Sequence, residues 1–80
     1  KMDVFMDWNE LKNHKVNVYT TTWCPDCHRF KAVIDRVGLK VTYIDIDKNP
    51  AAAVKLQKAT GRSAIPYVEI DERCFVQIHL

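Results

Sequence analysis

The sequence predicts an α/β domain built on one mixed, four-stranded sheet with flanking helices. Two observations lead to this prediction. Strand-like and helix-like segments alternate between Val16 and Thr60, and a strand–helix–strand unit crosses over right-handedly, which makes its two strands parallel. Two further strand-like segments, Pro66–Ile70 and Cys74–Ile78, follow with a short link that predicts an antiparallel hairpin. The expected order is helix-β-α-β-α-β-β.

The chain is predicted to begin with a short helix. Asp7, followed three residues later by Glu10, has the pattern of a capping box that opens a helix running to about His14. Trp8 on this helix is expected in the core. Val16–Tyr19 is then β-prone and predicts the first strand.

The central helix is predicted over residues 25–37. Pro25 suits the first helical turn, because the N–H that proline lacks has no helical partner there. Gly38 is the residue type that most often ends a helix. Apolar residues recur at helical spacing between them, which indicates an amphipathic helix. These residues are Phe30, Val33, Ile34 and Val37.

A second strand and a third helix follow. Val41–Ile46 is apolar on both faces, as a buried parallel strand is. Asn49 is expected to cap a helix that starts at Pro50, runs to Thr60 and stops at Gly61.

The closing hairpin has two notable features. Its link, Asp71-Glu72-Arg73, lacks the Gly or Asn that tight hairpin turns prefer. Cys74 is expected to alternate inward with Val76 and Ile78, which predicts a buried and unreactive thiol.

Size and charge exclude several classes of protein. The 80 residues are expected to form one domain, residues 1–80, and 48% of them are apolar, which is enough for a core. A net charge of +2 with both signs interspersed argues against nucleic acid or a charged membrane as partner. The apolar runs are too short to span a bilayer, and Lys1–Asp7 lacks the apolar segment of a signal peptide. The expected location is the cytoplasm.

The strongest functional signal is the pair Cys24 and Cys27, between a predicted strand and a predicted helix. At a helix N-terminus, unpaired N–H groups and the helix dipole stabilise a thiolate on Cys24. That thiolate attacks a substrate disulfide, and Cys27, one turn along and more buried, resolves the mixed disulfide. The sequence therefore predicts a thiol–disulfide oxidoreductase.

Two binding functions compete with this enzyme. A structural zinc site needs about four ligands. The candidate side chains are Cys24, Cys27, Cys74 and one of His14, His28 and His79. Cys24 to His28 also match the attachment pattern of c-type haem. Redox chemistry is preferred, because a zinc site lacks a second closely spaced cysteine pair, while haem attachment lacks evidence of export and the flanking strands already account for the chain. His28 is expected on the solvated surface rather than in catalysis.

The second signal is Ile65-Pro66 at the start of a predicted strand. It follows the third predicted helix, which ends at Thr60-Gly61. Together with the strand–Cys-Pro-x-Cys–helix segment, it resembles glutaredoxins and related small redoxins, including mycoredoxins, over about Val16–Ile70. The resemblance implies a thioredoxin-like fold and disulfide reductase activity. It also implies that Pro66 is cis and faces the thiols, and that the backbone of Ile65 pairs with a thiol substrate. Trp23 resembles the thioredoxin residue that flanks the substrate groove.

Departures from the family pattern concern the reductant. Thr20-Thr21-Thr22 stands where glutaredoxins carry a Lys, Ala64 replaces the usual Thr, and no Gly-Gly follows the last strand. Each change removes a contact with glutathione. Three external reductants therefore stay open: glutathione, another low-molecular-weight thiol, and a flavoprotein of the thioredoxin reductase type. Arg62 has two alternative interpretations. It is either the nearby cation that contacts a substrate carboxylate or a solvated surface residue. No bound cofactor is expected.

Asp26 stands where glutaredoxins favour Tyr. A carboxylate there disfavours a neighbouring thiolate, so Asp26 is a candidate tuning residue for Cys24; the alternative is that it only serves the helix dipole. An iron–sulfur carrier is a further alternative, but such carriers tend to lack the second cysteine or Pro25, and both are present here.

The family's C-terminal helix is apparently missing, because the sequence ends at Leu80, directly after a predicted strand. Part of one sheet face is then expected to be uncovered. The sequence predicts either a monomer whose tail was removed or a homodimer through that face. The expected substrates are disulfide-containing proteins or small mixed disulfides.

Overall fold

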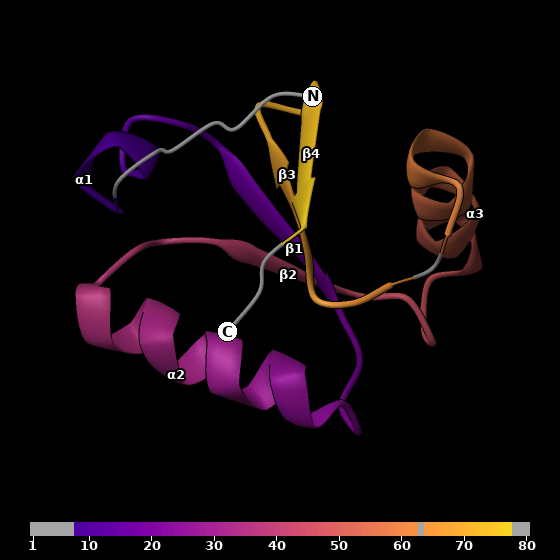
Figure 1. The fold of residues 1–80 in the computed structure, drawn as a ribbon, viewed down its shortest axis with the longest axis horizontal. Helices are drawn as coiled ribbons and strands as arrows, with labels where there is room; N and C mark the ends of the chain where they lie inside the picture. Colours follow the sequence, from indigo (N-terminus) through magenta and orange to yellow (C-terminus); the bar gives the residue numbers. More distant parts are fainter. Residues whose placement is uncertain (1–7, 63, 78–80) are drawn as a thin grey trace.

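A computed structural model describes residues 8–62 and 64–77 (Figure 1). The predicted order of elements is confirmed. The helices and strands are α1 (Trp8–Leu11), β1 (Val16–Thr20), α2 (Pro25–Val37), β2 (Thr42–Asp45), α3 (Pro50–Thr60), β3 (Tyr67–Ile70) and β4 (Cys74–Gln77). Within these residues, the structure contains no helix that is both long and apolar enough to cross a bilayer.

The four strands form one mixed sheet in the order β2-β1-β3-β4. β1 is parallel to β2 and antiparallel to β3, and β3 is antiparallel to β4, as predicted. Tyr19, near the end of β1, lies opposite Tyr67 at the start of β3. The segment that follows β1 and the segment that precedes β3 therefore lie at the same end of the sheet.

The prediction that residues 41–46 form a strand buried on both faces is wrong. β2 is an edge strand, and its first two side chains, Thr42 and Tyr43, are exposed. The strand with two buried faces is β1, whose residues from Val16 to Tyr19 are all buried. Edge position, which depends on distant pairing, decides burial here rather than the apolar pattern of the segment.

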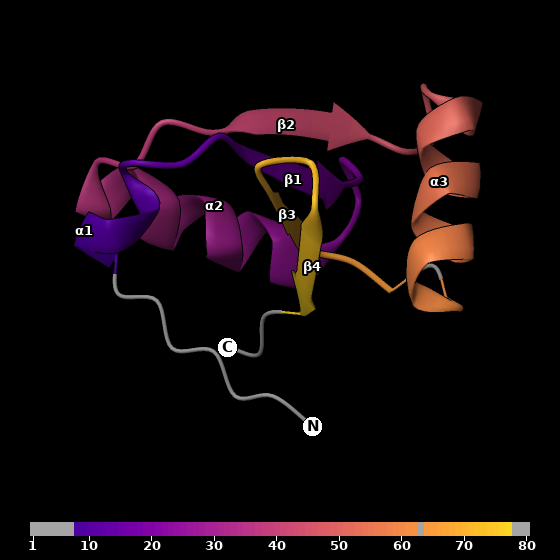
Figure 2. The same ribbon diagram turned by 90° about the horizontal axis from the view of Figure 1, so that it is seen from above.

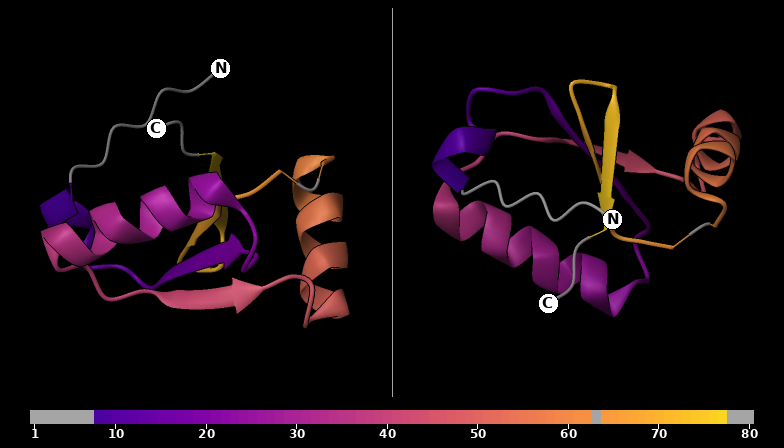
Figure 3. Two further views of the ribbon diagram at one scale, coloured as in Figure 1. Left: turned by 90° about the horizontal axis from the view of Figure 1, so that it is seen from below. Right: turned by 45° about the horizontal axis from the view of Figure 1, so that its top comes forward.

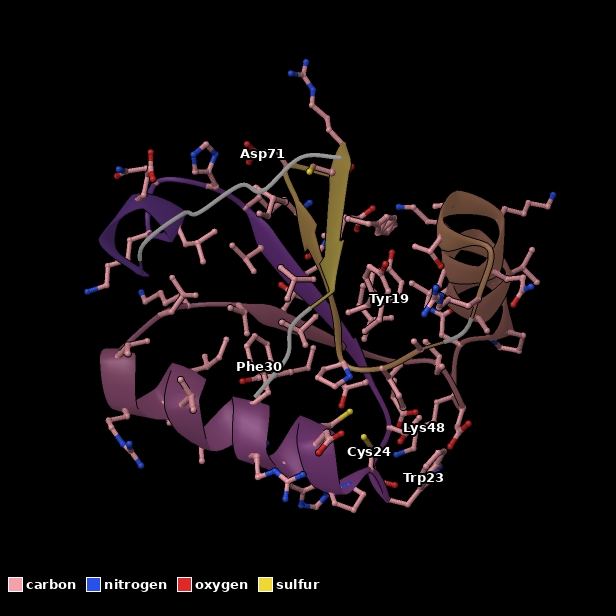
Figure 4. All side chains as sticks on the ribbon, in the orientation of Figure 1. Tyr19, Trp23, Cys24, Phe30, Lys48 and Asp71 are labelled. Atoms are coloured by element: carbon pink, nitrogen blue, oxygen red, sulfur yellow. The ribbon has the colours of Figure 1, made fainter. Side chains whose placement is uncertain are left out.

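The helices pack on opposite faces of the sheet (Figures 1 and 2). On one face, Val18 of β1 packs in a cluster with Phe30 and Ile34 of α2. On the other, Tyr19 packs with Leu56 of α3. The right view of Figure 3 gives the same layering, with the magenta α2 and the orange-brown α3 on either side of the strands, and Figure 4 places Phe30 and Tyr19 on opposite sides of β1. Consecutive residues of β1 thus serve two separate cores.

Local signals set the ends of α2 and α3 as predicted. Gly38 follows α2 with a φ of 74°, and Gly61 follows α3 with a φ of 79°, a region that favours glycine. At the start of α3, the Oδ1 atom of Asn49 accepts the backbone N–H of Ala52 at 3.1 Å. These caps satisfy backbone groups that a helix end leaves unpaired.

The first helix is shorter than predicted: α1 ends at Leu11 rather than near His14. His14 lies beyond it, and its Nδ1–H donates to Oδ2 of Asp71 at 2.6 Å, which is a contact with the distant hairpin. Asp7, the expected cap, lies outside the described residues, as does the side chain of Trp8.

The hairpin between β3 and β4 turns through two residues with left-handed backbone, Asp71 at a φ of 55° and Glu72 at 59°. The turn forms without glycine because two hydrogen bonds hold Asp71 to the backbone of Lys15. The Asp71 Oδ1 atom accepts the Lys15 N–H, and the Asp71 N–H donates to the Lys15 carbonyl. Tertiary hydrogen bonds therefore stabilise a turn that the sequence makes unfavourable.

The prediction that Cys74 is a buried thiol is wrong, because Cys74 is exposed. It opens β4, the outer strand, next to the turn at Asp71, where Figure 4 shows the end of the sheet farthest from Cys24. The side chain of Val76 and all of Ile78 lie outside the described residues. The predicted uncovered face around them stays a prediction.

A buried carboxylate joins the sheet to α3. Glu69 of β3 is 1% exposed and accepts hydrogen bonds from Asn17 Nδ2 at 3.0 Å and the Tyr19 hydroxyl at 3.1 Å. Lys55 of α3 adds an ion pair at 2.9 Å. Burial alone would raise the pKa of Glu69, but the hydrogen bonds from these three side chains outweigh it and hold the pKa below its ordinary value.

We expect Glu69→Ala to destabilise the protein by about 2–4 kcal/mol, because the change leaves the buried side-chain amide of Asn17 without its carboxylate partner and takes one hydrogen-bond partner from the Tyr19 hydroxyl. Urea unfolding at neutral pH measures it. The control is Glu72→Ala, which removes an exposed ion pair with Lys15 and should change the midpoint much less. Equal midpoints for the two variants would contradict the role of the buried network.

Candidate functional site

The site begins at the N-cap of α2. Cys24 occupies the cap position with an extended backbone, and its Sγ accepts the backbone N–H of Cys27 at 3.2 Å. Pro25 follows as the first helical residue, as predicted. A sulfur held by an amide at a helix N-terminus lies where the helix stabilises negative charge.

Cys27 lies one turn along, and its thiol packs against Cys24. The two residues are almost equally buried, with 6% of Cys24 and 5% of Cys27 exposed, so Cys27 is not the clearly more buried one that the sequence predicts. The two cysteines differ in environment instead. Burial, followed by a hydrogen bond with Cys24, raises the pKa of Cys27, and contacts with Thr20 and Thr21 oppose this only in part. Cys27 is therefore held as a thiol beside the Cys24 sulfur.

Ile65-Pro66 lies at the same end of the sheet. The peptide bond between the two residues is cis, as the resemblance implies. Pro66 is buried and directly precedes β3, while Cys24 follows β1, and these strands run antiparallel with Tyr67 opposite Tyr19. The pairing of β1 and β3 thus gathers two segments more than 35 residues apart in the sequence.

Trp23 stands exposed beside Cys24. Its side chain is 67% exposed, yet its Nε1–H donates to Oδ2 of Asp47 at 2.7 Å, which ties the loop before α2 to the loop after β2. Figure 4 shows Trp23 next to Cys24 at the edge of the molecule, with Lys48 nearby. His28 is also exposed, as expected, and its Nε2–H donates to the Thr22 carbonyl at 2.6 Å. The loop is therefore fixed while its indole faces outward.

The two charged candidates lie on the surface. Asp26, in the first turn of α2, is exposed and forms an ion pair with Arg29. Its carboxylate is thus shared with a cation, and its influence on Cys24 stays a hypothesis. Arg62 is exposed after α3, and no contact in the described part of the chain distinguishes its two predicted roles.

The zinc ligand set proposed from sequence does not assemble. Cys74 pairs with Ile70 at the hairpin end of the sheet, away from the end that carries Cys24 and Cys27. Among residues 8–62 and 64–77, no three His, Cys, Asp or Glu side chains converge as metal ligands.

A cavity of about 320 Å³ opens beside Cys27, on the side of β2, and sequence reasoning missed it. It forms where α2, the loop after β1 and the edge strand β2 meet, so its walls come from segments that no local pattern relates. The lining residues are Thr20, Thr21, Thr22, Cys27, His28, Lys31, Tyr43 and Asp45.

Two features lie at the same end of the four-stranded sheet: a cysteine pair at the start of the helix after β1, and a cis-proline before β3. Together they define a redox domain of the thioredoxin fold. The particular family follows from comparison. Residues 16–75 match the family model for glutaredoxin. The chain belongs to the glutaredoxin family.

Relatives of known name agree. The chain is 38% identical to glutaredoxin 3 of Escherichia coli over 56 residues, which cover 70% of this chain and 68% of that protein. It is 35% identical to a glutaredoxin of Pseudomonas aeruginosa over 57 residues, covering 71% and 68%.

Among solved structures, a buckwheat glutaredoxin–glutathione complex superposes with a TM-score of 0.63 at 27% identity, covering 75% of this chain and 57% of that one. A Brucella melitensis glutaredoxin gives 0.57 at 33% identity, covering 68% and 59%. The chain thus spans less than two thirds of the length of these two solved relatives.

We expect the alkylation of Cys27 by iodoacetamide, in a Cys24→Ser, Cys74→Ser variant, to rise with a higher pH midpoint in the folded protein than in the unfolded one, since burial is the largest cause that raises the pKa of Cys27. Mass spectrometry of the quenched protein measures the rate. The same variant unfolded in urea serves as the control and should titrate lower. Equal midpoints in both states would contradict the effect of burial.

Proposed function

We propose that the chain is a thiol–disulfide oxidoreductase that works through Cys24 as nucleophile and Cys27 as resolving thiol. The observation that supports it most is the contact between Cys24 Sγ and the Cys27 N–H at the N-cap of α2, at 3.2 Å. This amide and the helix dipole stabilise negative charge on the sulfur that attacks. Burial and the hydrogen bond to Cys24 keep Cys27 protonated until the second step.

The reaction proceeds through two exchanges. The Cys24 thiolate attacks one sulfur of the substrate disulfide, a mixed disulfide forms, and the other substrate sulfur leaves as a thiolate. Cys27 then loses its proton and attacks Cys24 Sγ, which closes the Cys24–Cys27 disulfide and expels the second substrate thiolate. The substrate gains two electrons and the protein pair loses them.

Two features at the same end of the molecule support a substrate that lies against the pair. Trp23 offers an exposed aromatic surface beside Cys24. The segment at Ile65, before β3, is proposed to pair with substrate backbone, in the manner of an added strand. Disulfide-containing proteins and mixed disulfides of small thiols both fit this arrangement.

The reductant is proposed to be a small thiol, with a flavoprotein reductase as the alternative. A buckwheat relative was solved as a glutathione complex, which supports glutathione for the family fold. In this chain, Thr21 and its neighbours stand where the family carries a Lys, so the contact with a glutathione carboxylate has to come from another residue. Arg62 is the proposed candidate.

We expect Cys24→Ser to abolish reduction of insulin disulfides, because no other thiol occupies the N-cap. Cys27→Ser should also fail to turn over on insulin but should still form a mixed disulfide with the substrate, since the first exchange needs Cys24 alone. A turbidity assay with dithiothreitol and mass spectrometry of trapped adducts measure both steps. Cys74→Ser is the control and should keep wild-type activity. Activity retained by Cys24→Ser would contradict the proposal.

A further inference from the structure

The N-cap of α2 weakens in the middle of the proposed reaction. In the structure, Cys24 Sγ accepts the backbone N–H of Cys27 at 3.2 Å. Once this sulfur is bonded to a substrate sulfur, it carries no negative charge and is a weaker hydrogen-bond acceptor. The contact that positions Cys24 is therefore weakened in the mixed disulfide, which is the state in which Cys27 must reach it.

His28 holds the same loop without using a sulfur atom. Its backbone N–H donates to the Cys24 carbonyl at 3.1 Å, and its ring Nε2–H donates to the Thr22 carbonyl at 2.6 Å. Because a carbonyl oxygen only accepts, the ring nitrogen that faces it carries the proton. One residue of α2 therefore holds the chain both before Trp23 and after Cys24.

The ring contact of His28 is not part of the helix or of the core. The side chain is exposed, and its partner Thr22 precedes α2. Thr22, Cys27 and His28 line one cavity, which places this contact beside the cysteine pair. The loop is also held at Trp23, but that bond goes to Asp47 after β2. The His28 ring instead ties the loop to α2, the helix that carries Cys27.

We propose that His28 is a positioning residue for the second exchange. Its ring holds the Thr22 carbonyl against α2, so that Cys24 Sγ stays within reach of Cys27 while it is bonded to the substrate. The ring proton stays on the Thr22 carbonyl throughout, so His28 transfers no proton. This inference rests on the proposed redox function and adds a residue to its second step.

The test separates the two exchanges in a Cys74→Ser background, which removes the exposed third thiol. The reduced protein is mixed with substoichiometric dithiodipyridine, an uncharged disulfide that releases an absorbing thiopyridone at each exchange. Cys24 displaces the first thiopyridone. Cys27 gives its proton to the buffer, displaces the second from the mixed disulfide and closes the Cys24–Cys27 disulfide. Stopped-flow absorbance gives a rate constant for each release.

We expect His28→Ala to slow the second release about three- to tenfold, the effect of one lost hydrogen bond. The first release should change by less than about twofold, because Cys24 is still capped by the Cys27 N–H when it attacks. His28→Gln should restore the second release, since its side-chain amide also donates a hydrogen bond but takes up no proton.

His14→Ala is the matched control. The His14 ring also makes a 2.6 Å hydrogen bond, with Asp71, which Figure 4 shows at the end of the sheet away from Cys24. Its removal should leave both releases unchanged. The proposal is overturned if His28→Ala leaves the second release unchanged or slows both releases equally. It is also overturned if His28→Gln is as slow as His28→Ala, because His28 would then act through its proton or its charge.

Two further results separate this inference from the proposed function. If the protein with His28 intact releases the first thiopyridone but never the second, Cys27 does not resolve the mixed disulfide, and the proposed function fails together with the inference. Heteronuclear NMR of the imidazole tests the contact alone. Neutral His28 should carry its proton on Nε2, and a proton on Nδ1 would overturn the contact with Thr22 and leave the proposed function intact.

Discussion

The hydrogen bond from the backbone N–H of Cys27 to Cys24 Sγ is the contact on which the rest of this structure depends. This one hydrogen bond caps the N-terminus of α2 and also joins the two cysteines of the proposed redox pair. The capping atom is a sulfur rather than the usual hydroxyl or carboxylate oxygen, so the atom that starts the helix is also the proposed nucleophile. The contacts that position α2 therefore also position the two cysteines of the proposed site.

The orientation of α2 comes from β1. Its consecutive residues Val18 and Tyr19 face different helices, so one central strand holds α2 on one face and α3 on the other. β1 also sets the register with β3 that brings the Ile65-Pro66 segment to the end of the sheet where Cys24 lies. The buried carboxylate of Glu69 on β3 also fixes how β1, β3 and α3 pack together, because its hydrogen-bond and ion-pair partners lie on β1 and α3.

The sequence was most informative where structure is local. The bounds of α2 and α3 follow from Pro25, Gly38, Asn49 and Gly61, each of which acts on its own helix end. It was least informative where a residue's surroundings come from distant segments. The edge position of β2, which exposes Tyr43, depends on which strand pairs with β1, and an apolar pattern does not encode that.

The same distinction explains the candidate site. The cysteine motif and the Ile65-Pro66 segment are recognisable in the sequence because their chemistry is carried by residues that are adjacent in it. The exposure of Cys74 and the cavity beside Cys27 are not recognisable in the sequence. Both depend on how elements that are distant in the sequence pack against one another.

The assignment of Cys24 as the nucleophile is tested most directly by competition within one molecule. Reduced protein at neutral pH is treated with substoichiometric iodoacetamide, and peptide mass spectrometry gives the ratio of alkylated Cys24 to alkylated Cys27. We expect Cys24 to be modified well ahead of Cys27, because the α2 N-terminus stabilises its thiolate while burial holds Cys27 as a thiol. Equal labelling of the two cysteines, or labelling of Cys27 first, would contradict it.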